Sequence, residues 1–463
     1  MSSWLIIIGI CYAGVLIYLS LRSRKTIATG DDFMMGGSKI GLVLGFMTFA
    51  ATLFSTFTLM GMPDFSRTHG VGAWIFLAFS DAIMVFVVIG FGFYLRQRVG
   101  QRNYNGMSAL LQEAYGNKGA GYLYFITVFL FLIPYVAIQI RGVAIFLVAA
   151  FPSVLPAWGW SVLIVLFMLI YSELGGLKAI IYADFMQGTL LLLVVWFIAI
   201  SCLDAVGGWY ALFEKTAATQ KALLATPGPK GLLTPQFLIA SCIAIAMIPI
   251  TQPQLSTRLV IMKDYAALRR MAVAVGTFAM LVILPTIIIG LYGAINYPTD
   301  NAATFLSNVL LHEQPHPIAA FTIIGLFAAA MSTSDSQLFA LGNEIRGIFN
   351  LKNNLKPVRI TIMVFALAAL FFSVFSSDQL VLLARLSFSG TALMGPLILL
   401  GLFSPKPVGQ FMIYASAIAL GIYILSQLNA LPQILFGLRL DLSLFIFLGF
   451  CALGNFYSVK KRG

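Results

Sequence analysis

The sequence predicts an all-α integral membrane protein with thirteen transmembrane helices. Its 463 residues are 60% hydrophobic and only 10% charged, and the mean hydropathy is +0.95. A soluble domain carries about 25% charged residues, so this chain has too few charges to cover a water-exposed surface. Its apolar residues fall instead into long runs, and a helix of about 20 such residues spans a bilayer.

Thirteen apolar runs define the predicted elements. No segment between them is long enough for a separate soluble domain, so residues 1–463 form a single membrane domain. The longest predicted loops are 207–232 and 296–315. The predicted spans lie near 4–21, 40–62, 71–95, 121–151, 154–172, 179–205, 233–257, 271–295, 316–345, 358–375, 379–403, 407–427 and 435–457.

The basic residues predict the orientation. They gather in alternate loops, which the positive-inside rule places in the cytoplasm. The N-terminus is then outside and the C-terminus inside, as an odd number of spans requires, and we expect a bacterial inner (plasma) membrane. The net charge of +12 comes with no base-reading or zinc motif, so we expect lipid and not nucleic acid as its partner. The loops in question hold Arg22, Arg24, Lys25, Arg96, Arg98, Arg102, Lys178, Lys263, Arg269, Arg270, Arg346, Lys352, Lys356, Arg359, Lys406, Lys460, Lys461 and Arg462.

Two of the spans are interrupted. The second holds the small and polar stretch 50–56, and the seventh holds Pro249 and Pro253. Proline frees a carbonyl, which in lipid must face protein, water or an ion. A simple proline kink is the alternative, but spans five apart fit inverted repeats whose broken first helices meet at mid-membrane. The chain then divides into an extra first helix at 4–21, repeat 1 at 40–205, repeat 2 at 233–403 and two C-terminal helices at 407–457.

The ninth span carries a polar cluster at 332–337 within an apolar helix. Ala329, Ser332 and Thr333 follow helical i, i+3, i+4 spacing and share one face. Hydroxyl and carbonyl oxygens are ligands suited to a hard cation. Serine and threonine alone could instead bond within the helix or between helices. The intramembrane carboxylate of Asp335 favours a cation path.

Two further charged residues lie within apolar surroundings. Asp184, early in the sixth span, is either a cation ligand, a partner of an arginine, or a carboxylate near the cytoplasmic interface. Arg141 either holds a carboxylate of a solute or forms a structural salt bridge, with Asp81 or Asp335 as partner. No nucleotide-binding or hydrolase motif is present, so we expect no enzyme and no ATP-driven pump.

These segments resemble the solute:sodium symporter family, whose members have the LeuT-like fold. The resemblance covers nearly the whole chain and implies a transporter domain that imports a small polar solute with sodium by alternating access. No obligatory protein partner is expected. The most specific parts are 329–333 with 335–337, the segment from Gly175 through Asp184 to Gln187, Leu59–Pro63, and 395–402.

The resemblance also implies site residues. The principal sodium site would take the carbonyls of Ala51, Phe54 and Ala329 with the hydroxyls of Ser332 and Thr333. A possible second sodium would lie at Asp184, Ser332, Asp335 and Ser336, although Asp335 stands where such members have serine. The solute cavity between the broken helices has the candidates Ser55, Thr56, Thr58, Gln139, Arg141, Thr251, Gln252 and Gln254.

The segment 139–141 looks like the pattern of relatives that handle small monocarboxylates. We therefore expect a carboxylate-bearing organic acid or an amino acid, with a sugar-type solute as the alternative. Proton coupling through Asp335 and Asp184 is the rival to sodium coupling. A sensor or channel with a transporter-like core is the alternative from another class.

Overall fold

The computed structural model is helical apart from one short hairpin. It describes residues 2–24, 40–100, 104–351, 356–376, 379–404 and 408–461. In that part the strands β1 (Ile434–Leu435) and β2 (Leu438–Arg439) pair antiparallel. The predicted last span therefore begins too early, because its helix starts at Leu440, after the hairpin. Lys25, Arg102, Lys352, Lys406 and Arg462 of the predicted cytoplasmic loops lie outside the described residues.

Each of the thirteen predicted spans contains helix. Within the described ranges, nine helices are long and apolar enough to cross a membrane, and one bent pair is a tenth. The remaining three predicted spans correspond to the shorter apolar helices Ala157–Ile170, Pro235–Ala246 and Phe411–Gln427. The total of thirteen spans thus stays a prediction. Both long predicted loops contain short helices, at 209–224 in the first loop and at 302–312 in the second.

The elements follow one another from an N-terminal helix to a C-terminal helix. The first half contains α1 (Ser2–Arg24), α3 (Leu42–Leu53), η1 (Phe57–Gly61), α4 (Met62–His69), α5 (Gly72–Trp74), η2 (Ile75–Phe79), α6 (Ser80–Val99), α7 (Met107–Tyr115), α8 (Lys118–Ala150), α9 (Ala157–Val206), α10 (Trp209–Gln220) and η3 (Lys221–Leu224). The second half contains α11 (Pro235–Ala246), α12 (Ile248–Thr251), α13 (Pro253–Ile261), α14 (Tyr265–Asn296), α15 (Ala302–Ser307), η4 (Asn308–His312), α16 (His316–Ile348), α17 (Lys356–Phe375), α18 (Leu380–Ala392), α19 (Gly395–Phe403), α20 (Phe411–Gln427) and α21 (Leu440–Lys461).

The second and seventh predicted spans are both broken. α3 and the following helix, η1 with α4, meet at an angle of 54°. Hydroxyl side chains next to the break compete with the backbone for hydrogen bonds, which explains an interruption without proline or glycine. In the seventh span Gln252 is extended (φ −106°, ψ 120°), and Pro253, which has no amide hydrogen to donate, begins α13.

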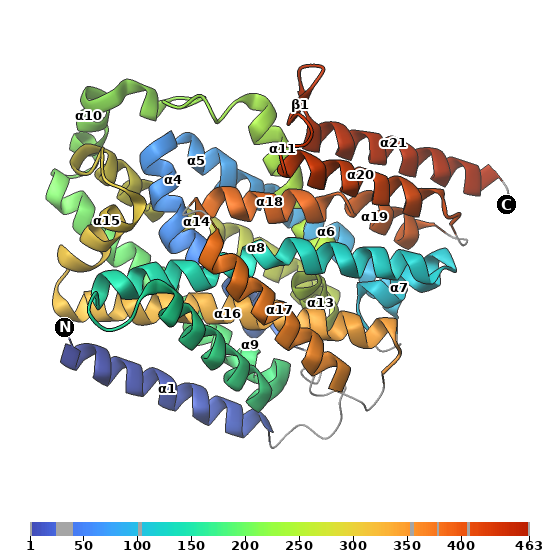
Figure 1. The fold of residues 1–463 in the computed structure, drawn as a ribbon, viewed down its shortest axis with the longest axis horizontal. Coiled ribbons are helices and arrows are strands. Elements are labelled where there is room, and N and C mark those ends of the chain that lie inside the picture. Colours follow the sequence, from blue (N-terminus) through green and yellow to red (C-terminus); the bar gives the residue numbers. More distant parts are fainter. Residues whose placement is uncertain are drawn as a thin grey trace.

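The broken helices lie in the centre of the bundle (Figure 1). α3 packs against α9, α14 and α16, and α13 packs against α3, α6 and α16. α9 comprises two helices joined at Gly176, whose φ of 61° requires the freedom of glycine. α1 covers α9 and α16 on one side, while α20 and α21 lie on the opposite side. The additional terminal helices therefore flank a core formed by 40–403.

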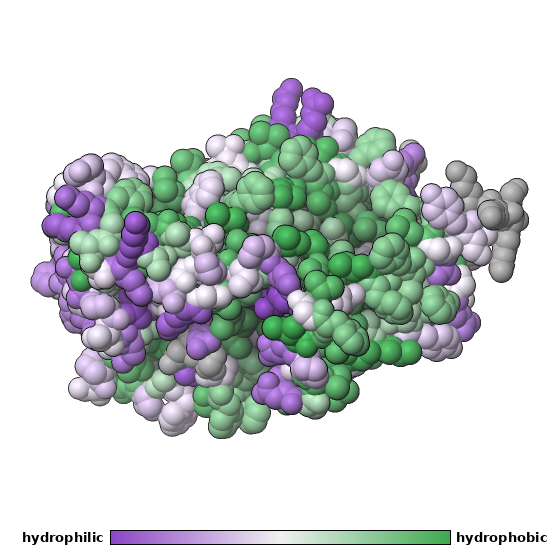
Figure 2. All heavy atoms as spheres, turned by 90° about the horizontal axis from the view of Figure 1, so that it is seen from above, coloured by the Kyte–Doolittle hydropathy of each residue, from purple (hydrophilic) through white to green (hydrophobic). Residues whose placement is uncertain are grey.

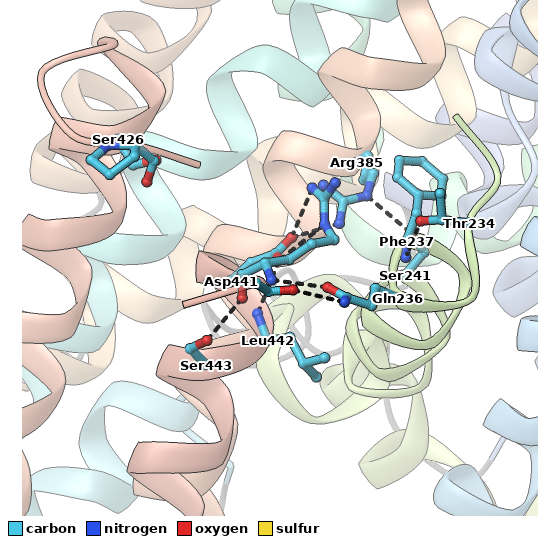
Figure 3. Close-up of polar contacts among 12 residues, drawn as sticks. Thr234, Gln236, Phe237, Ser241, Arg385, Ser426, Asp441, Leu442 and Ser443 are labelled. Carbon is cyan, nitrogen blue, oxygen red and sulfur yellow. Dashed lines mark hydrogen bonds and ion pairs between the residues drawn. The ribbon is translucent and has the colours of Figure 1, made fainter. Parts of the chain in front are cut away.

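A buried charged cluster fastens the last helix to this core (Figure 3). Arg385 of α18 forms an ion pair with Asp441 at 2.5 Å and donates to Ser241 of α11 at 2.9 Å. Arg439 approaches the same carboxylate at 3.3 Å. Both guanidinium groups lie over the ring of Phe237, at 4.6 and 5.3 Å from its centroid. The cluster thus joins α11, α18 and α21.

Many large hydrophobic side chains are exposed on the surface. Figure 2 shows hydrophilic side chains gathered at the end that carries α10 and α15, and hydrophobic side chains over most of the middle. Phe86 and Phe450 are 75% and 70% exposed, respectively. Large aromatic side chains exposed in this way suit contact with lipid tails. Together with the long apolar helices, this surface makes the chain an integral membrane protein.

Glycine permits the close approach of α14 to α4. A Cβ added at Gly290 would lie 2.6 Å from the carbonyl oxygen of Pro63 and 2.9 Å from the amide nitrogen of Arg67. We expect Gly290→Ala to destabilise the protein by about 1–3 kcal/mol, because backbone atoms would have to move. Gly421→Ala is the control, since its Cβ would meet nothing within 4 Å. Thermal unfolding in detergent measures both; equal midpoints for the two variants would contradict this account.

Candidate functional site

The break after α3 turns three backbone amides toward side chains. The helix ends at Leu53, and Phe54 is extended, with φ −94° and ψ 122°. An uninterrupted helix would pair each following amide with the carbonyl four residues earlier. Side-chain oxygens replace those carbonyls: Thr58 Oγ1 accepts from Ser55 at 3.3 Å, Gln139 Oε1 from Thr56 at 3.1 Å, and Ser55 Oγ from Phe57 at 3.2 Å.

The carbonyls of residues 51–54 lose their helical partners at the same break. The carbonyl of Leu53 accepts from the Tyr135 hydroxyl of α8 at 3.3 Å. The carbonyls of Ala51 and Thr52 lie 3.5 and 3.4 Å from the Thr333 hydroxyl of α16. These are long, weak contacts for hydroxyl donors. Three oxygens, two from the backbone and one from a side chain, therefore converge between α3 and α16.

Of the residues predicted for the principal sodium site, Ala51 and Thr333 meet at this junction, and the others lie on the same two packed elements. Ala329, Ser332 and Thr333 share one face of α16, and each is at most 2% exposed. Phe54 stands at the break itself and is also buried. Among the described residues no group of three His, Cys, Asp or Glu side chains could hold a metal. The available ligands are therefore hydroxyl and carbonyl oxygens, which suit a hard monovalent cation.

Asp184 of α9 lies at the centre of a second polar cluster. Its Oδ1 accepts from the Ser332 hydroxyl at 2.5 Å, and its Oδ2 accepts from the Thr48 hydroxyl at 2.5 Å. The same Oδ2 forms an ion pair with Arg258 of α13 at 3.3 Å. Both charged side chains are almost completely buried, at 0% and 2% exposure. Such a pair is held by mutual charge and hydrogen bonds, because neither ion is solvated.

Arg258 uses all three of its nitrogens within this cluster. Its Nε donates to Thr48, one terminal nitrogen to the Gln254 carbonyl at 2.8 Å, and the other to Ser336 Oγ at 2.6 Å. The sequence prediction missed this residue because the seventh span was ended at 257. A single arginine four residues after Gln254, on the same face of a continuing helix, was the available signal.

The guanidinium of Arg258 lies where the second sodium was predicted. Asp184 and Ser336 contact it directly, and Ser332 contacts Asp184. Asp335, the fourth predicted ligand, is buried, and its Oδ1 has no hydrogen-bond partner in the described part of the chain. A positive charge of the protein itself thus balances Asp184.

Four solute candidates gather around the first break. Gln139 accepts from the Thr56 amide and donates to Ser55 Oγ at 3.2 Å, which fixes its amide orientation. Thr58 accepts from the Ser55 amide. The hydroxyl of Thr56 is buried and has no partner within the described ranges. This hydroxyl is therefore the free polar group of the cluster.

Asp81 of α6 faces the same break. Its two carboxylate oxygens are buried and have no hydrogen-bond partner among the described residues. It lines a small cavity of about 10 Å³ together with Phe54 and Thr58. That volume is close to the minimum for one water. A buried carboxylate without a partner is costly, so a donor from a solute or water would be favourable here.

The candidates of the second break form a separate group. Gln254 donates to Gln252 Oε1 at 2.7 Å, and Gln252 donates to Thr391 of α18 at 3.4 Å. The Thr251 carbonyl accepts from the Tyr124 hydroxyl at 3.1 Å. Among the described residues, no hydrogen bond joins these side chains directly to the cluster at the first break. Arg258, through the Gln254 carbonyl, is the link to the Asp184 cluster.

Arg141 lies away from the other solute candidates. It donates to the carbonyls of Ser373 and Val374, at 2.8 and 3.4 Å, near the C-terminal end of α17. Residues two apart on a helix point to different sides. Because Gln139 points to the break, Arg141 points elsewhere, toward α17. A cation at a helix C-terminus also suits the helix dipole.

Comparisons with known proteins identify the family. The family model described as the sodium:solute symporter family matches residues 33–418. A sodium/pantothenate symporter of Haemophilus influenzae is 25% identical over 333 residues, covering 70% of this chain and 67% of the relative. A sodium/proline symporter of Staphylococcus saprophyticus is 25% identical over 436 residues, covering 87% and 82%.

Solved structures share the fold. A sodium-coupled sialic acid symporter in a substrate-bound outward-open state aligns with a TM-score of 0.80 at 17% identity. The alignment covers 99% of this chain and 97% of that structure. At this identity the likeness establishes the fold, which extends over the whole chain.

The buried ion pair predicts a large coupling free energy. Arg258→Met alone would leave Asp184 buried and uncompensated, so we expect a loss of about 3–5 kcal/mol of stability. The double variant Arg258→Met/Asp184→Asn removes both charges and should be less destabilised than the sum of the two single changes. Chemical unfolding of the four proteins in detergent micelles measures the cycle. Additive effects would mean that the two groups do not interact.

Proposed function

The chain belongs to the sodium:solute symporter family, and from that premise we propose that it imports a small carboxylate-bearing solute, an organic acid or an amino acid, by alternating access. Sodium is the coupling ion of this family, and the solved neighbours have the expected LeuT-like fold. The solute class and the residues below are our proposals. The observation that carries them is the contact between Thr333 and the carbonyls freed at the break of α3.

The proposed sodium site is formed by oxygens of Ala51, Phe54, Ala329, Ser332 and Thr333. It is supported by the convergence of freed carbonyls and α16 hydroxyls across two helices that pack together. A sodium ion would stabilise the arrangement in which α3 and α16 are held side by side. Because linkage is reciprocal, the solute that favours the same arrangement then raises the affinity for sodium by an equal factor.

The proposed stoichiometry is one sodium per solute. Arg258 supports it, because its guanidinium already neutralises Asp184 and contacts Ser336. For a zwitterionic amino acid one net charge moves with each solute, and 100 mV then yields about 2.3 kcal/mol, which corresponds to about fifty-fold accumulation. A monocarboxylate anion and one sodium carry no net charge together, so the sodium gradient alone would drive its uptake. A second sodium at Asp184, Ser332, Asp335 and Ser336 would first require this guanidinium to move.

The proposed solute site lies at the first break. Ser55, Thr56, Thr58 and Gln139 converge there, and the free hydroxyl of Thr56 is available to a ligand. The broken helix starts again at this point, so its N-terminal end favours a carboxylate. Asp81 would accept a hydrogen bond from an ammonium or hydroxyl group at the other end of the solute. Thr251, Gln252 and Gln254 form the facing wall.

The relatives support a solute with a carboxylate. Their names specify pantothenate and proline, and both compounds carry this group. Arg141 remains a candidate anchor only if its contact with the end of α17 is exchanged for a solute. We favour the first-break cluster, because its free hydroxyl needs no such exchange.

The proposed topology has two inverted repeats, 40–205 and 233–403, in one transporter domain of thirteen spans. Both repeats begin with a broken helix, α3 with η1 and α11 with α12 and α13. We place the N-terminus outside and the C-terminus in the cytoplasm of a bacterial inner membrane, in accord with the basic loops.

Loss of one sodium ligand should weaken sodium activation selectively. Thr333→Val keeps the shape but removes the hydroxyl, so we expect the half-saturating sodium concentration of uptake to rise about ten-fold or more. Ser334→Ala is the matched control, a neighbouring buried hydroxyl whose oxygen has no described partner. Uptake of labelled pantothenate and proline by proteoliposomes measures both. Unchanged sodium dependence in Thr333→Val, for a solute that is transported, would reject the site.

The two possible carboxylate anchors predict different phenotypes. If the solute binds at the first break, Thr56→Val should raise its KM about ten-fold, as expected for a lost hydrogen bond to a charged group. Arg141→Gln should then lower protein stability with little change in KM, because the contact with the end of α17 is lost. The reverse pattern, a large KM change in Arg141→Gln alone, would assign the anchor to Arg141.

A further inference from the structure

We propose that the hairpin between α20 and α21 forms, with the arginine at its base, a binding site for a phospholipid. The phosphate of the lipid pairs with Arg439, and its acyl chain packs on the hairpin. The hairpin comprises residues 428–439, with β1 and β2 as its strands. It projects from the side of the bundle, next to α11 and α21 (Figure 1). It contains none of the residues proposed above for sodium or solute.

The exposed side chains of the hairpin are apolar. Phe436 at its tip is 96% exposed, and Leu428 and Ile434 are 71% and 61% exposed. Residues 428–438 include no charged side chain, whereas the loops at 207–232 and 296–315 carry several. Phe436 also has a φ of 51°, a left-handed conformation that is unfavourable for an L-residue. An apolar tip held outward on such a turn fits contact with lipid.

The polar backbone of the hairpin is paired within the protein. The two strands pair antiparallel, and the Leu440 amide donates to the Gln433 carbonyl at 2.9 Å. The side chain of Gln236 in α11 donates to the Gly437 carbonyl at 2.8 Å and accepts from the Arg439 amide at 3.2 Å. A backbone that enters lipid needs such partners, because no water replaces them there. The hairpin can therefore lie against the bilayer.

The base of the hairpin has one excess positive charge. Arg385 and Arg439 both pair with Asp441, at 2.5 and 3.3 Å, and in the described part of the chain no second carboxylate pairs with either arginine. The side chains of Arg385 and Asp441 are 10% and 9% exposed, whereas that of Arg439 is 21% exposed. The accessible member of the cluster is thus a cation. A lipid phosphate is the anion that a membrane surface supplies to balance it.

The cation and the apolar surface lie on one face of the hairpin. Ile434 stands directly opposite Arg439 in the ladder, and opposite residues project to the same side. The guanidinium of Arg439 lies over the ring of Phe237, at 5.3 Å from its centroid, which restricts its position. A phosphate on Arg439 would place the attached acyl chain beside Ile434.

These groups lie at the level of the lipid headgroups. α21 has 22 residues and is about 33 Å long, close to the hydrocarbon thickness of about 30 Å. Its first turn, which contains Asp441, is therefore at one membrane surface. Figure 3 shows Asp441 in one cluster with Gln236 and Phe237, which belong to the first turn of α11. In the proposed topology this surface is the outer one.

Competition between brominated and ordinary lipids measures the site in vesicles. The reporter is a bimane fluorophore on Leu435→Cys, a position that is 42% exposed and leaves Ile434 and Arg439 unchanged. Vesicles of phosphatidylglycerol and phosphatidylcholine, with the acyl chains of one or the other brominated, give the binding constant of the anionic lipid relative to the zwitterionic one. We expect a ratio of about five, the factor that one arginine at a membrane surface contributes. The native cysteines replaced by alanine are Cys11, Cys202, Cys242 and Cys451.

Arg439→Gln should lower this ratio to about one. The substitution removes the excess charge but keeps the ion pair of Arg385 with Asp441. Arg439→Lys keeps the charge and should retain the preference for the anionic lipid. Arg22→Gln is the matched control, because it removes an exposed arginine at the end of α1, away from the hairpin. Its ratio should stay at about five.

Four results would overturn the proposal. A ratio in Arg439→Gln equal to that of the parent protein would show that Arg439 does not hold the phosphate. Loss of the preference in Arg439→Lys would show that the charge does not set it. Fluorescence that neither brominated lipid quenches would mean that water or a second copy of the chain covers the hairpin. A ratio that falls when millimolar glycerol phosphate is added to the buffer would assign the site to a soluble anion.

Discussion

A backbone that is interrupted inside an apolar bundle must find new hydrogen-bond partners, and this constraint organises the whole structure. The break after Leu53 leaves three amides and four carbonyls without their usual helical partners inside an apolar bundle. Side chains of α8 satisfy part of this demand, and Thr333 of α16 lies beside two of the carbonyls. These oxygens are thereby concentrated at one helix junction, where we propose that a cation binds.

The buried Asp184–Arg258 pair shows the same constraint acting on charged groups. A buried carboxylate needs a counter-charge, and Arg258 of the second broken helix supplies it while also contacting Thr48 of the first. Four helices therefore meet at one ion pair. Ser332 bridges this pair and the proposed sodium site, since it donates to Asp184 and stands next to Thr333. A movement of α13 relative to α3 would disturb Ser332 and Thr333, which we propose as ligands of the cation, and such a link is the physical requirement for coupling.

The sequence alone determined the membrane class, the approximate positions of most apolar helices and the two broken spans, because hydrophobicity and proline act locally along the chain. It also indicated Ser332 and Thr333, since a polar stripe in an apolar helix can be read from spacing. It could not show which distant groups meet. Gln139 and Arg141 looked alike as neighbours in one span, yet their helix directs one to the break and the other to α17. Only the tertiary structure placed Arg258 on Asp184, because an ion pair between residues 74 positions apart depends on how α9 and α13 pack.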